Sequence, residues 1–223
     1  MGAPVWKAIA GGDEDTATPS SFALARTYGL GRLLTFGHDG IVQGLDELDN
    51  RAFMVNTIKW LNNGGSKQVA YTEGHGEWQQ GTQLADLQSE MAGLGYSFSA
   101  ITGRISTASL AGKKVLIIGN AWQTFEWNEY TDIQAFVNGG GGVLMLGLGW
   151  SWTGANYDDY PMNALGEYFQ VRWLRGSISD ATHQTNGSPI FHTFYPRVPY
   201  HDSSAPTGRI AAAHAAHPVD LPS

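Results

Sequence analysis

Residues 114–150 read KVLIIGNAWQTFEWNEYTDIQAFVNGGGGVLMLGLGW, and this stretch decides the fold class. It opens with the apolar run Val115-Leu116-Ile117-Ile118 and closes on a second one, Val143-Leu144-Met145-Leu146. Short apolar runs of this kind are typical of strands buried in parallel sheets. Between them, apolar residues recur at helical spacing over 133–137, and the glycines at 139–142 end the predicted helix. The stretch therefore predicts a strand, a helix and a second strand.

The same alternation begins earlier in the chain. Residues 68–72, QVAYT, predict a strand, and leucines and a methionine at helical spacing over 84–94 predict the helix that follows. A short strand is expected over 96–101. Alternating strands and helices favour a parallel sheet, so the predicted fold is α/β, with a flavodoxin-like, doubly wound, mostly parallel sheet.

An N-terminal hairpin and helix are expected to be added to this sheet. Residues 22–39 predict the hairpin, with its turn at Tyr28-Gly29-Leu30-Gly31, where glycine tolerates positive φ. A helix over 53–61 then ends at Asn62-Asn63-Gly64-Gly65. The α/β domain is expected to span 1–175, with an irregular lead-in over 1–21.

The remaining residues, 176–223, predict an irregular C-terminal extension and tail. The net charge of −7 gives no electrostatic reason to expect a nucleic-acid partner. No apolar run approaches the roughly 20 residues of a membrane-spanning helix, and no signal peptide begins the sequence, which leaves cytoplasmic and extracytoplasmic locations both open. The chain contains no cysteine, which excludes disulfides and every cysteine nucleophile.

Three motifs carry a resemblance to known families. YGLGR at 28–32, TFGHD at 35–39, and Asn56 with Trp60-Leu61 resemble the signature of ThuA-like and GIFT-type domains, which are glutamine-amidotransferase-like. TEGHGE at 72–77 resembles the GIFT domain of gliding-motility transporter auxiliary proteins. The order of motifs is similar to the domain that precedes the enhancin-type metallopeptidase in TRP-channel-associated factors and their bacterial relatives.

This resemblance implies a class I glutamine-amidotransferase-like fold and glycan-related or scaffolding work. It transfers no catalytic residue, because residues 147–152 stand where true amidotransferases carry a cysteine. The sequence also lacks a His-Glu-x-x-His motif, so the metallopeptidase itself is absent. Whether the chain belongs to a larger multidomain protein stays open.

Ligands of open parallel sheets bind beyond the carboxyl ends of the strands. Four segments are expected there, and together they predict an aromatic-rich rim that binds a carbohydrate or a protein partner. The alternative for its tryptophans is burial in the core. The candidate ligand-binding residues are His38, Asp39, Glu73, His75, Glu77, Trp78, Asn120, Trp122, Trp150 and Trp152.

The alternative function is a serine hydrolase of the esterase kind. The sequence GWSWTG at 149–154 resembles a nucleophile elbow around Ser151, although Thr153 stands where the pattern has glycine. His192 and His201 lie late in the chain, where the base of an acyl-transfer enzyme often lies. The simpler interpretation makes Ser151 a turn residue between two packing tryptophans.

Metal ions and cofactors are not expected. Four rim residues are of the right ligand type, but their spacing matches no known zinc or calcium pattern. The simpler interpretation is that Glu73 and His75 hydrogen-bond neighbouring loops. The four residues of ligand type are His38, Asp39, His75 and Glu77.

Overall fold

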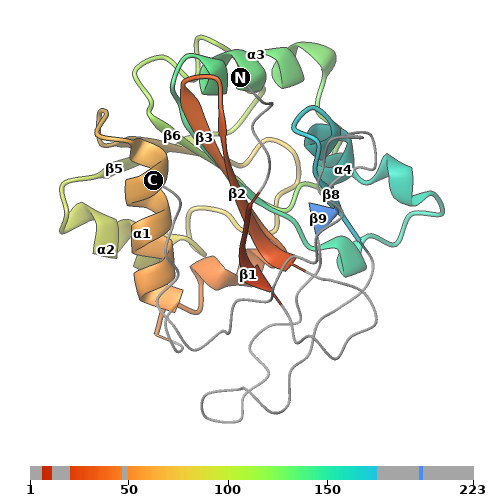
Figure 1. Cartoon of the computed structure of the whole chain (residues 1–223), viewed down its shortest axis with the longest axis horizontal. Coiled ribbons are helices and arrows are strands. Elements are labelled where there is room, and N and C mark those ends of the chain that lie inside the picture. Colours follow the sequence, from red (N-terminus) through yellow and green to blue (C-terminus); the bar gives the residue numbers. More distant parts are fainter. Residues whose placement is uncertain (1–6, 12–20, 47–49, 175–195, 198–223) are drawn as a thin grey trace.

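A computed structural model describes residues 7–11, 21–46, 50–174 and 196–197 of the chain (Figure 1). A seven-stranded sheet has the order β1-β2-β3-β7-β6-β4-β5. From β3 to β5 in this order all neighbours are parallel, whereas β1 and β2 are antiparallel additions. The strands are β1 (Lys7–Gly11), β2 (Ser21–Tyr28), β3 (Gly31–Phe36), β4 (Gln68–Thr72), β5 (Ser97–Ile101), β6 (Val115–Ile118) and β7 (Gly142–Leu146).

The protein is therefore a mixed α/β structure with a mostly parallel sheet, consistent with a flavodoxin-like fold. The strands predicted over 68–72, 115–118 and 143–146 are confirmed, and so is the hairpin, formed by β2 and β3. β3 occupies the place beside β7, where Leu34 pairs with Leu144. The N-terminal hairpin thus completes the parallel part of the sheet.

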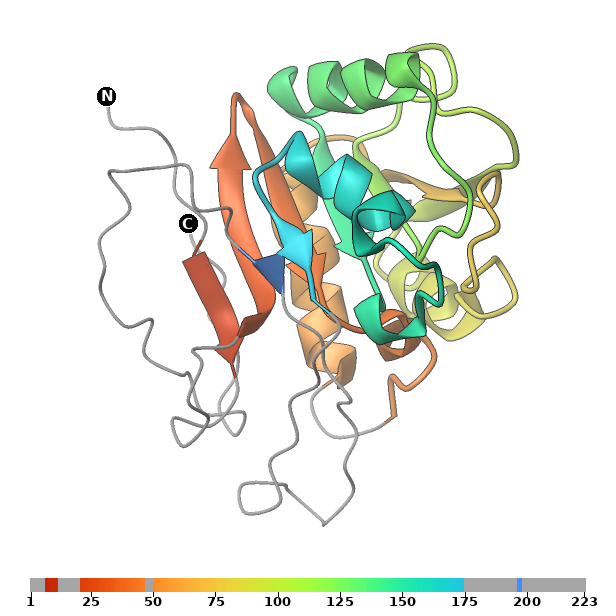
Figure 2. The same ribbon diagram turned by 90° about the vertical axis from the view of Figure 1, so that its right-hand side faces the viewer.

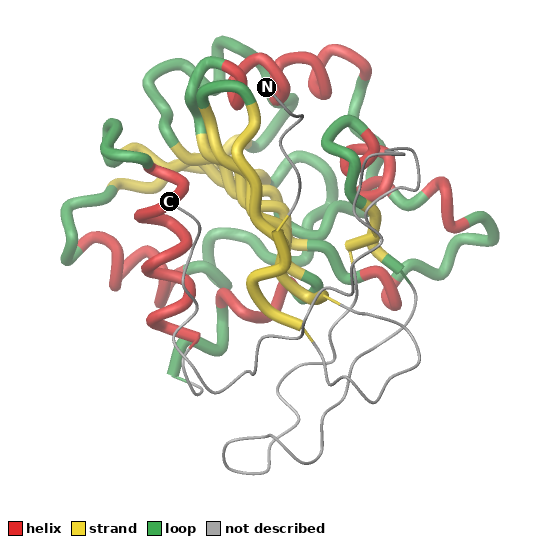
Figure 3. The backbone as a smooth tube through the Cα atoms, viewed as in Figure 1, coloured by secondary structure: helices red, strands yellow, loops and turns green. Residues whose placement is uncertain are grey.

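Helices cover the sheet on two sides. They are α1 (Asn50–Asn62), α2 (Ala85–Ala92), α3 (Trp127–Asn138) and α4 (Pro161–Glu167). α1 and α2 contribute Ile58, Leu61 and Leu87 to one buried cluster, and α3 and α4 contribute Ile133 and Leu165 to another. Figure 3 shows the strands as a central yellow band with red helices on either side.

Glycine allows close approach at the base of the sheet. A Cβ on Gly142, the first residue of β7, would lie 2.3 Å from the carbonyl oxygen of Leu61 in α1. Gly29 has φ +58 in the turn between β2 and β3, as the sequence predicts for this turn. Gly142 thus lets α1 pack closely against β7, and Gly29 allows the tight turn between β2 and β3.

Two short elements differ from the expectations. The lead-in expected to be irregular contains β1, which pairs with β2 at the outer edge of the sheet (Figure 2). The extension expected after residue 175 contains β9 (Pro196–Arg197), paired with β8 (Arg172–Trp173). Both depend on pairing with residues distant in the sequence, which a local pattern does not record. No helix of the described ranges is long and apolar enough to cross a membrane.

Candidate functional site

Four loops meet at the carboxyl edge of the sheet, because β3, β7, β6 and β4 are parallel neighbours. We call these loops the rim; they comprise residues 37–46, 73–83, 119–126 and 147–160. Every candidate site residue that the structure describes lies in one of them. The rim also contains short 3-10 turns, η1 (Asp39–Val42), η2 (Gly149–Ser151) and η3 (Tyr157–Asp159).

The loop after β4 crosses the neighbouring strand ends. A Cβ on Gly119, at the end of β6, would lie 3.3 Å from the carbonyl oxygen of Gln79 and from the side chain of Glu77. Farther along, the Gln79 side-chain amide donates to Gln43 Oε1 at 3.5 Å. This loop therefore reaches from β4 to the loop after β3.

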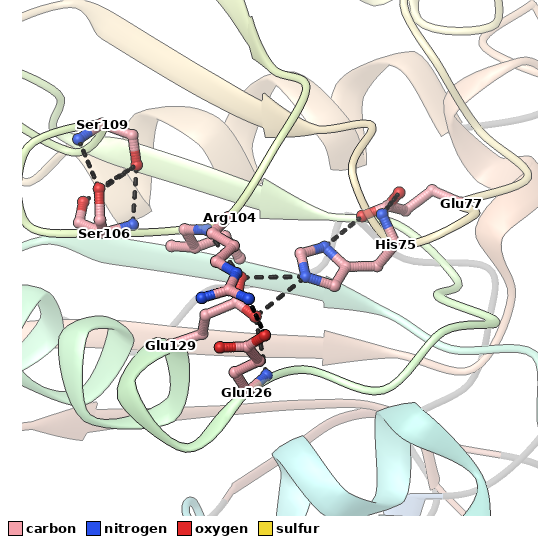
Figure 4. A network of polar contacts seen from close by, with 8 residues as sticks. His75, Glu77, Arg104, Ser106, Ser109, Glu126 and Glu129 are labelled. Atoms are coloured by element: carbon pink, nitrogen blue, oxygen red, sulfur yellow. Dashed lines mark hydrogen bonds and ion pairs between the residues drawn. The ribbon is translucent and has the colours of Figure 1, made fainter.

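A buried ion-pair network holds the middle of the rim (Figure 4). His75 is 5% exposed, and its Nε2 lies 3.0 Å from Oε1 of Glu129. Its Nδ1 lies 3.5 Å from Oε1 of Glu77, and its ring stacks on Phe125 at 4.3 Å between centroids. The imidazole is thus enclosed by two carboxylates and one aromatic ring, which we call the His75 network.

The His75 network joins three segments of backbone. The His75 carbonyl accepts hydrogen bonds from the backbone N–H groups of Trp122 and Gln123, each at 2.9 Å. Glu129 accepts from the N–H of Ile105 at 2.7 Å and from that of Glu126 at 2.8 Å. Loops after β4, β5 and β6 are therefore fixed to the start of α3.

The charges in the network favour a protonated imidazole. Burial lowers the pKa of His75, but its contacts with the carboxylates of Glu77 and Glu129 outweigh burial and raise the pKa above its ordinary value. Burial raises the pKa of Glu77, but the contact with the His75 ring and the hydrogen bond that Oε2 accepts from the His75 backbone N–H at 2.7 Å outweigh burial and lower the pKa. The network is therefore a charged structural clamp.

Glu129 and Phe125 are the members of the network that are not among the residues expected from the sequence. Glu129 carries the second carboxylate. It lies in the first turn of α3, and Glu126 and Glu129 form a capping box at that helix start. The spacing of two glutamates three residues apart before an apolar helix is the signal that marks a helix start. Glu73 hydrogen-bonds its own loop, as the simpler interpretation of this residue expects. Its Oε1 accepts from the N–H of Gly81 at 2.7 Å.

Two of the predicted rim tryptophans lie together. Trp122 and Trp152 are half-buried, with ring centroids 5.8 Å apart and planes tilted by 43°. The indole N–H of Trp152 donates to the carbonyl of Asn156 at 3.0 Å, and the Trp152 ring packs on Tyr160 at 5.7 Å. The indole nitrogen of Trp122 is buried without a hydrogen-bond partner among the described residues. We call Trp122 and Trp152 the tryptophan pair.

The other tryptophans are not part of this pair. Trp78 is 69% exposed and Trp127 is 71% exposed. Trp127, the first residue of α3, packs edge-on against Tyr168 at 5.8 Å. The side chain of Trp150 falls outside the described part of the structure, although its backbone belongs to η2.

A layer of buried polar side chains lies at this edge, which we call the polar layer: Asp39, Gln79, Asn120 and Tyr160. Each is at most 3% exposed. Asn120 Oδ1 accepts from the hydroxyl of Tyr160 and, at 3.2 Å, from the N–H of Leu148. Burial raises the pKa of Tyr160 well above its ordinary value, and the nearby charge of Asp39 adds to this. The hydroxyl therefore stays protonated.

Ser151 takes part in the same hydrogen-bond system. Its hydroxyl donates to the carbonyl of Leu148 at 2.6 Å and accepts from Asn120 Nδ2 at 3.2 Å. A carbonyl oxygen cannot act as a base, so this arrangement does not activate the hydroxyl. The candidate bases His192 and His201 lie outside the described residues.

Asp39 is the first residue of η1, in the loop after β3, and is 2% exposed. Its Oδ1 lies 3.8 Å from Nδ1 of His38, but that nitrogen accepts the N–H of Gly40 at 2.9 Å and so carries no proton in this contact. Burial raises the pKa of Asp39 to about 6, although backbone N–H groups and Gln79 donate hydrogen bonds to it. Within the described ranges, no three His, Asp or Glu side chains are placed to hold a metal ion.

Comparisons with known proteins agree with this architecture. No family model matches the chain. It is 22% identical over 180 residues to a TRPM8 channel-associated factor homolog of Xenopus laevis, covering 77% of this chain and 18% of that protein. It is 27% identical over 154 residues to the Danio rerio homolog, covering 66% of this chain and 14% of that protein.

The chain thus spans less than a fifth of the length of the curated relatives that it matches. Among solved structures it is similar to IMPa from Pseudomonas aeruginosa in complex with an O-glycopeptide, with a TM-score of 0.50 and 15% identity. That similarity covers 72% of this chain and 18% of IMPa. The sequence and fold likenesses are consistent with a GIFT-like domain.

Proposed function

We propose that this chain is a doubly wound, glutamine-amidotransferase-like domain that binds a carbohydrate or protein partner at the rim without catalysing a reaction. The tryptophan pair carries this proposal. Its rings are half-buried, so they are held in place by the protein and still present a face to solvent. Fixed indole rings suit the apolar face of a sugar and are frequent anchors in protein interfaces.

The surroundings of the pair support binding rather than chemistry. The indole N–H of Trp122 is buried and lacks a hydrogen-bond partner in the described structure, whereas the indole N–H of Trp152 is held by the carbonyl of Asn156. The His75 network fixes the backbone of Trp122, because the His75 carbonyl accepts its N–H. A site that is positioned before the ligand arrives loses less entropy on binding.

The relatives favour the same ligand classes. The curated relatives are named for association with a channel protein, and the solved IMPa structure is named for its complex with an O-glycopeptide. An O-glycopeptide combines a sugar with an extended peptide. Both parts are chemically suited to a rim that joins indole rings to buried hydrogen-bonding groups.

Binding is tested with three probes: an O-glycopeptide, the same peptide without sugar, and the free glycan. The full chain is titrated with each probe by calorimetry, beside Trp122→Ala and Trp152→Ala. Trp127→Ala is the matched control, because Trp127 is a solvent-exposed tryptophan at the start of α3, outside the pair.

We expect at least one probe to bind the native chain and to lose about tenfold or more in affinity in either pair variant, as for an anchor residue. The control variant is expected to bind within twofold of the native chain. Binding of none of the three probes would contradict the proposal, as would equal losses in all three variants. Circular dichroism shows whether each variant is folded.

A further inference from the structure

Two Asn-Gly-Gly sequences lie at the ends of described helices. Asn63 is followed by Gly64 and Gly65 directly after α1, and Asn138 is the last residue of α3, followed by two further glycines. Asparagine followed by glycine is prone to deamidation, because glycine has no Cβ to hinder attack by its own backbone nitrogen. The two sites share one local sequence, so a difference between them in the folded protein comes from the structure.

At the end of α1, the peptide group between Asn63 and Gly64 takes no part in hydrogen bonding. The groups on either side do: the N–H of Asn63 donates to the carbonyl of Lys59 at 3.3 Å, and the N–H of Gly65 donates to the carbonyl of Asn62 at 2.8 Å. Neither the Asn63 carbonyl nor the Gly64 N–H has a partner among the described residues. Solvent base therefore reaches the Gly64 N–H without first breaking a hydrogen bond.

The space around this peptide group is open. Asn63 and Gly64 are both exposed, and a Cβ on Gly64 would meet nothing within 4 Å. Asn63 has φ +45, in the left-handed region, which asparagine tolerates at the end of a helix but which is strained for residues other than glycine. Rotation out of this region relieves the strain, so the local fold gives little resistance to the approach of the Gly64 nitrogen to the Asn63 side chain.

The site at the end of α3 is protected by hydrogen bonds. The N–H of Gly139 donates to the carbonyl of Ala135 at 2.9 Å, and the carbonyl of Asn138 accepts the N–H of Leu30 at 3.2 Å. The Asn138 side-chain oxygen also lies against Gly29, where an added Cβ would clash with it. Asn138 and Gly139 are exposed, as the first pair is. Hydrogen bonding, and not exposure, therefore distinguishes the two sites.

We infer that Asn63 is a site of spontaneous deamidation in the folded protein, with the backbone nitrogen of Gly64 as the nucleophile, and that Asn138 is spared. Hydroxide removes the Gly64 N–H proton, and the nitrogen forms a bond to the side-chain carbonyl carbon of Asn63. The bond from that carbon to the amide nitrogen breaks, and the leaving nitrogen takes a proton from water, which releases ammonia, regenerates hydroxide and leaves a cyclic imide. Water then opens the imide at either carbonyl and gives aspartate or isoaspartate. This inference does not depend on the proposed function of the rim.

The products change the end of α1. Each replaces a neutral amide with a carboxylate, and added negative charge is unfavourable at the C-terminal end of a helix, where the helix dipole is negative. Isoaspartate also adds a methylene to the main chain between two hydrogen-bonded groups, the N–H of Asn63 and the N–H of Gly65. The modification therefore loosens the turn that ends α1, next to Leu61, which packs against the first residue of β7.

The test compares the two sites within the native full chain, incubated at pH 6 and at pH 9. Conversion is measured by peptide mapping with mass spectrometry, because exchange of an amide for a carboxyl group changes the mass of the peptide. Trypsin releases Asn63 between Lys59 and Lys67, and chymotrypsin, which cleaves after Phe136, releases Asn138. Incubation in heavy-oxygen water labels each new carboxyl group.

Parallel samples in guanidinium chloride give the rates in the unfolded chain, where no helix protects either site. Asn63→Asp supplies the standard for the aspartate product. Asn63→Gln is the matched variant, because its longer side chain would have to form a larger ring. A third Asn-Gly pair, Asn186-Gly187, lies outside the described residues, and its peptide is separated in the map.

In the folded protein we expect Asn63 to convert about tenfold or more faster than Asn138, because hydrogen bonds have to break before Asn138 can react. In guanidinium chloride the two rates should agree within about threefold. The rate at Asn63 should rise from pH 6 to pH 9, because the Gly64 N–H has to lose its proton. Asn63→Gln is expected to remove the conversion at this position and to leave that of Asn138 unchanged.

Equal rates at the two sites in the folded protein would overturn the inference, as would conversion of Asn63 only in the unfolded chain. A difference of the same size in guanidinium chloride would also overturn it, because the preceding residues, Asn62 and Val137, and not the fold, would then set the rates. The comparison uses two sites of the native chain, so it holds even if circular dichroism shows that Asn63→Gln is misfolded.

Discussion

Nε2 of His75 lies 3.0 Å from Oε1 of Glu129, so a side chain from the loop after β4 is paired with the first turn of α3. Glu129 is 1% exposed, and its two carboxylate oxygens also accept two backbone N–H groups. One buried carboxylate therefore stabilises a histidine, a helix start and a loop together.

Replacing Glu129 with glutamine is expected to destabilise the protein by about 3 kcal/mol at pH 7, because one member of a buried charged pair is removed. Urea unfolding measures the loss. The matched control is Glu126→Gln, which removes an exposed ion pair with Arg104 and should cost less than about 1 kcal/mol. Equal losses in the two variants would show that the His75 network is no stronger than a surface ion pair.

The His75 network should also make stability depend on pH. Because the pKa of His75 is raised in the folded state, its contribution is fully present below the unfolded pKa of about 6.5 and is lost as pH rises through the folded value. NMR titration of the imidazole checks the direction, and urea unfolding at pH 6 and pH 9 checks the consequence. A folded pKa below 6.5 would contradict the charged clamp.

Asp39 should also make stability fall as the pH rises, but over a lower pH range. Its folded pKa of about 6 is above the ordinary value of 3.8, so the charged group costs stability once the pH exceeds the unfolded value, and the full cost is reached above pH 6. Asp39→Asn is expected to stabilise the protein at pH 8 by on the order of 3 kcal/mol and to change little at pH 3.5.

Thermal and urea unfolding at these two pH values measure the Asp39 effect, with Asp159→Asn as the exposed control. Two titratable groups face the carboxyl group, His38 beside it and Tyr160 across the polar layer. Tyr160 stays protonated in this range, whereas His38 contacts Asp39, so its contribution does not cancel between the variants and its titration is followed by NMR in each of them. A stability difference that does not change between pH 3.5 and pH 8 would mean that folding does not raise the pKa of Asp39.

Ser151→Ala is expected to leave any hydrolysis of p-nitrophenyl acetate unchanged. The Ser151 hydroxyl donates its hydrogen bond to the carbonyl of Leu148, and a carbonyl oxygen is not basic enough to remove the proton. The native chain and the variant are compared at equal concentration, and Asn120→Ala serves as a second probe of the same hydrogen-bond system. Activity that disappears in Ser151→Ala alone would favour the alternative function, the serine hydrolase.

The sequence predicted the fold well wherever local pattern determines structure. Val115 to Ile118 and Val143 to Leu146 are buried on both faces of the sheet, so their apolar runs identify them without knowledge of their neighbours. α3 was also identified by a local pattern, because its buried apolar residues Ile133 and Val137 recur at helical spacing. β1 was missed because it has no such pattern and depends on pairing with β2.

The candidate site could be predicted only in part. The carboxyl ends of parallel strands share one edge of a sheet, and this rule places His75, Asn120 and Trp122 together from the sequence alone. The contacts that give these residues their roles come from elsewhere: Glu129 from α3 and Tyr160 from the start of α4. Such partners depend on how helices pack against the sheet. Trp122 is half-buried and Trp78 is exposed, and no spacing in the sequence predicts this difference.

The pairing of β3 with β7 has a consequence for how the chain folds. Leu34 and Leu144 are neighbours in the sheet although more than a hundred residues separate them along the chain. Closing so long a loop costs entropy before the contact repays it, and folding rates fall as such distant contacts accumulate. We therefore expect the β4–α2–β5–β6–α3–β7 unit to collapse first and the hairpin to dock last, leaving an open β7 edge that is exposed to aggregation during synthesis and refolding.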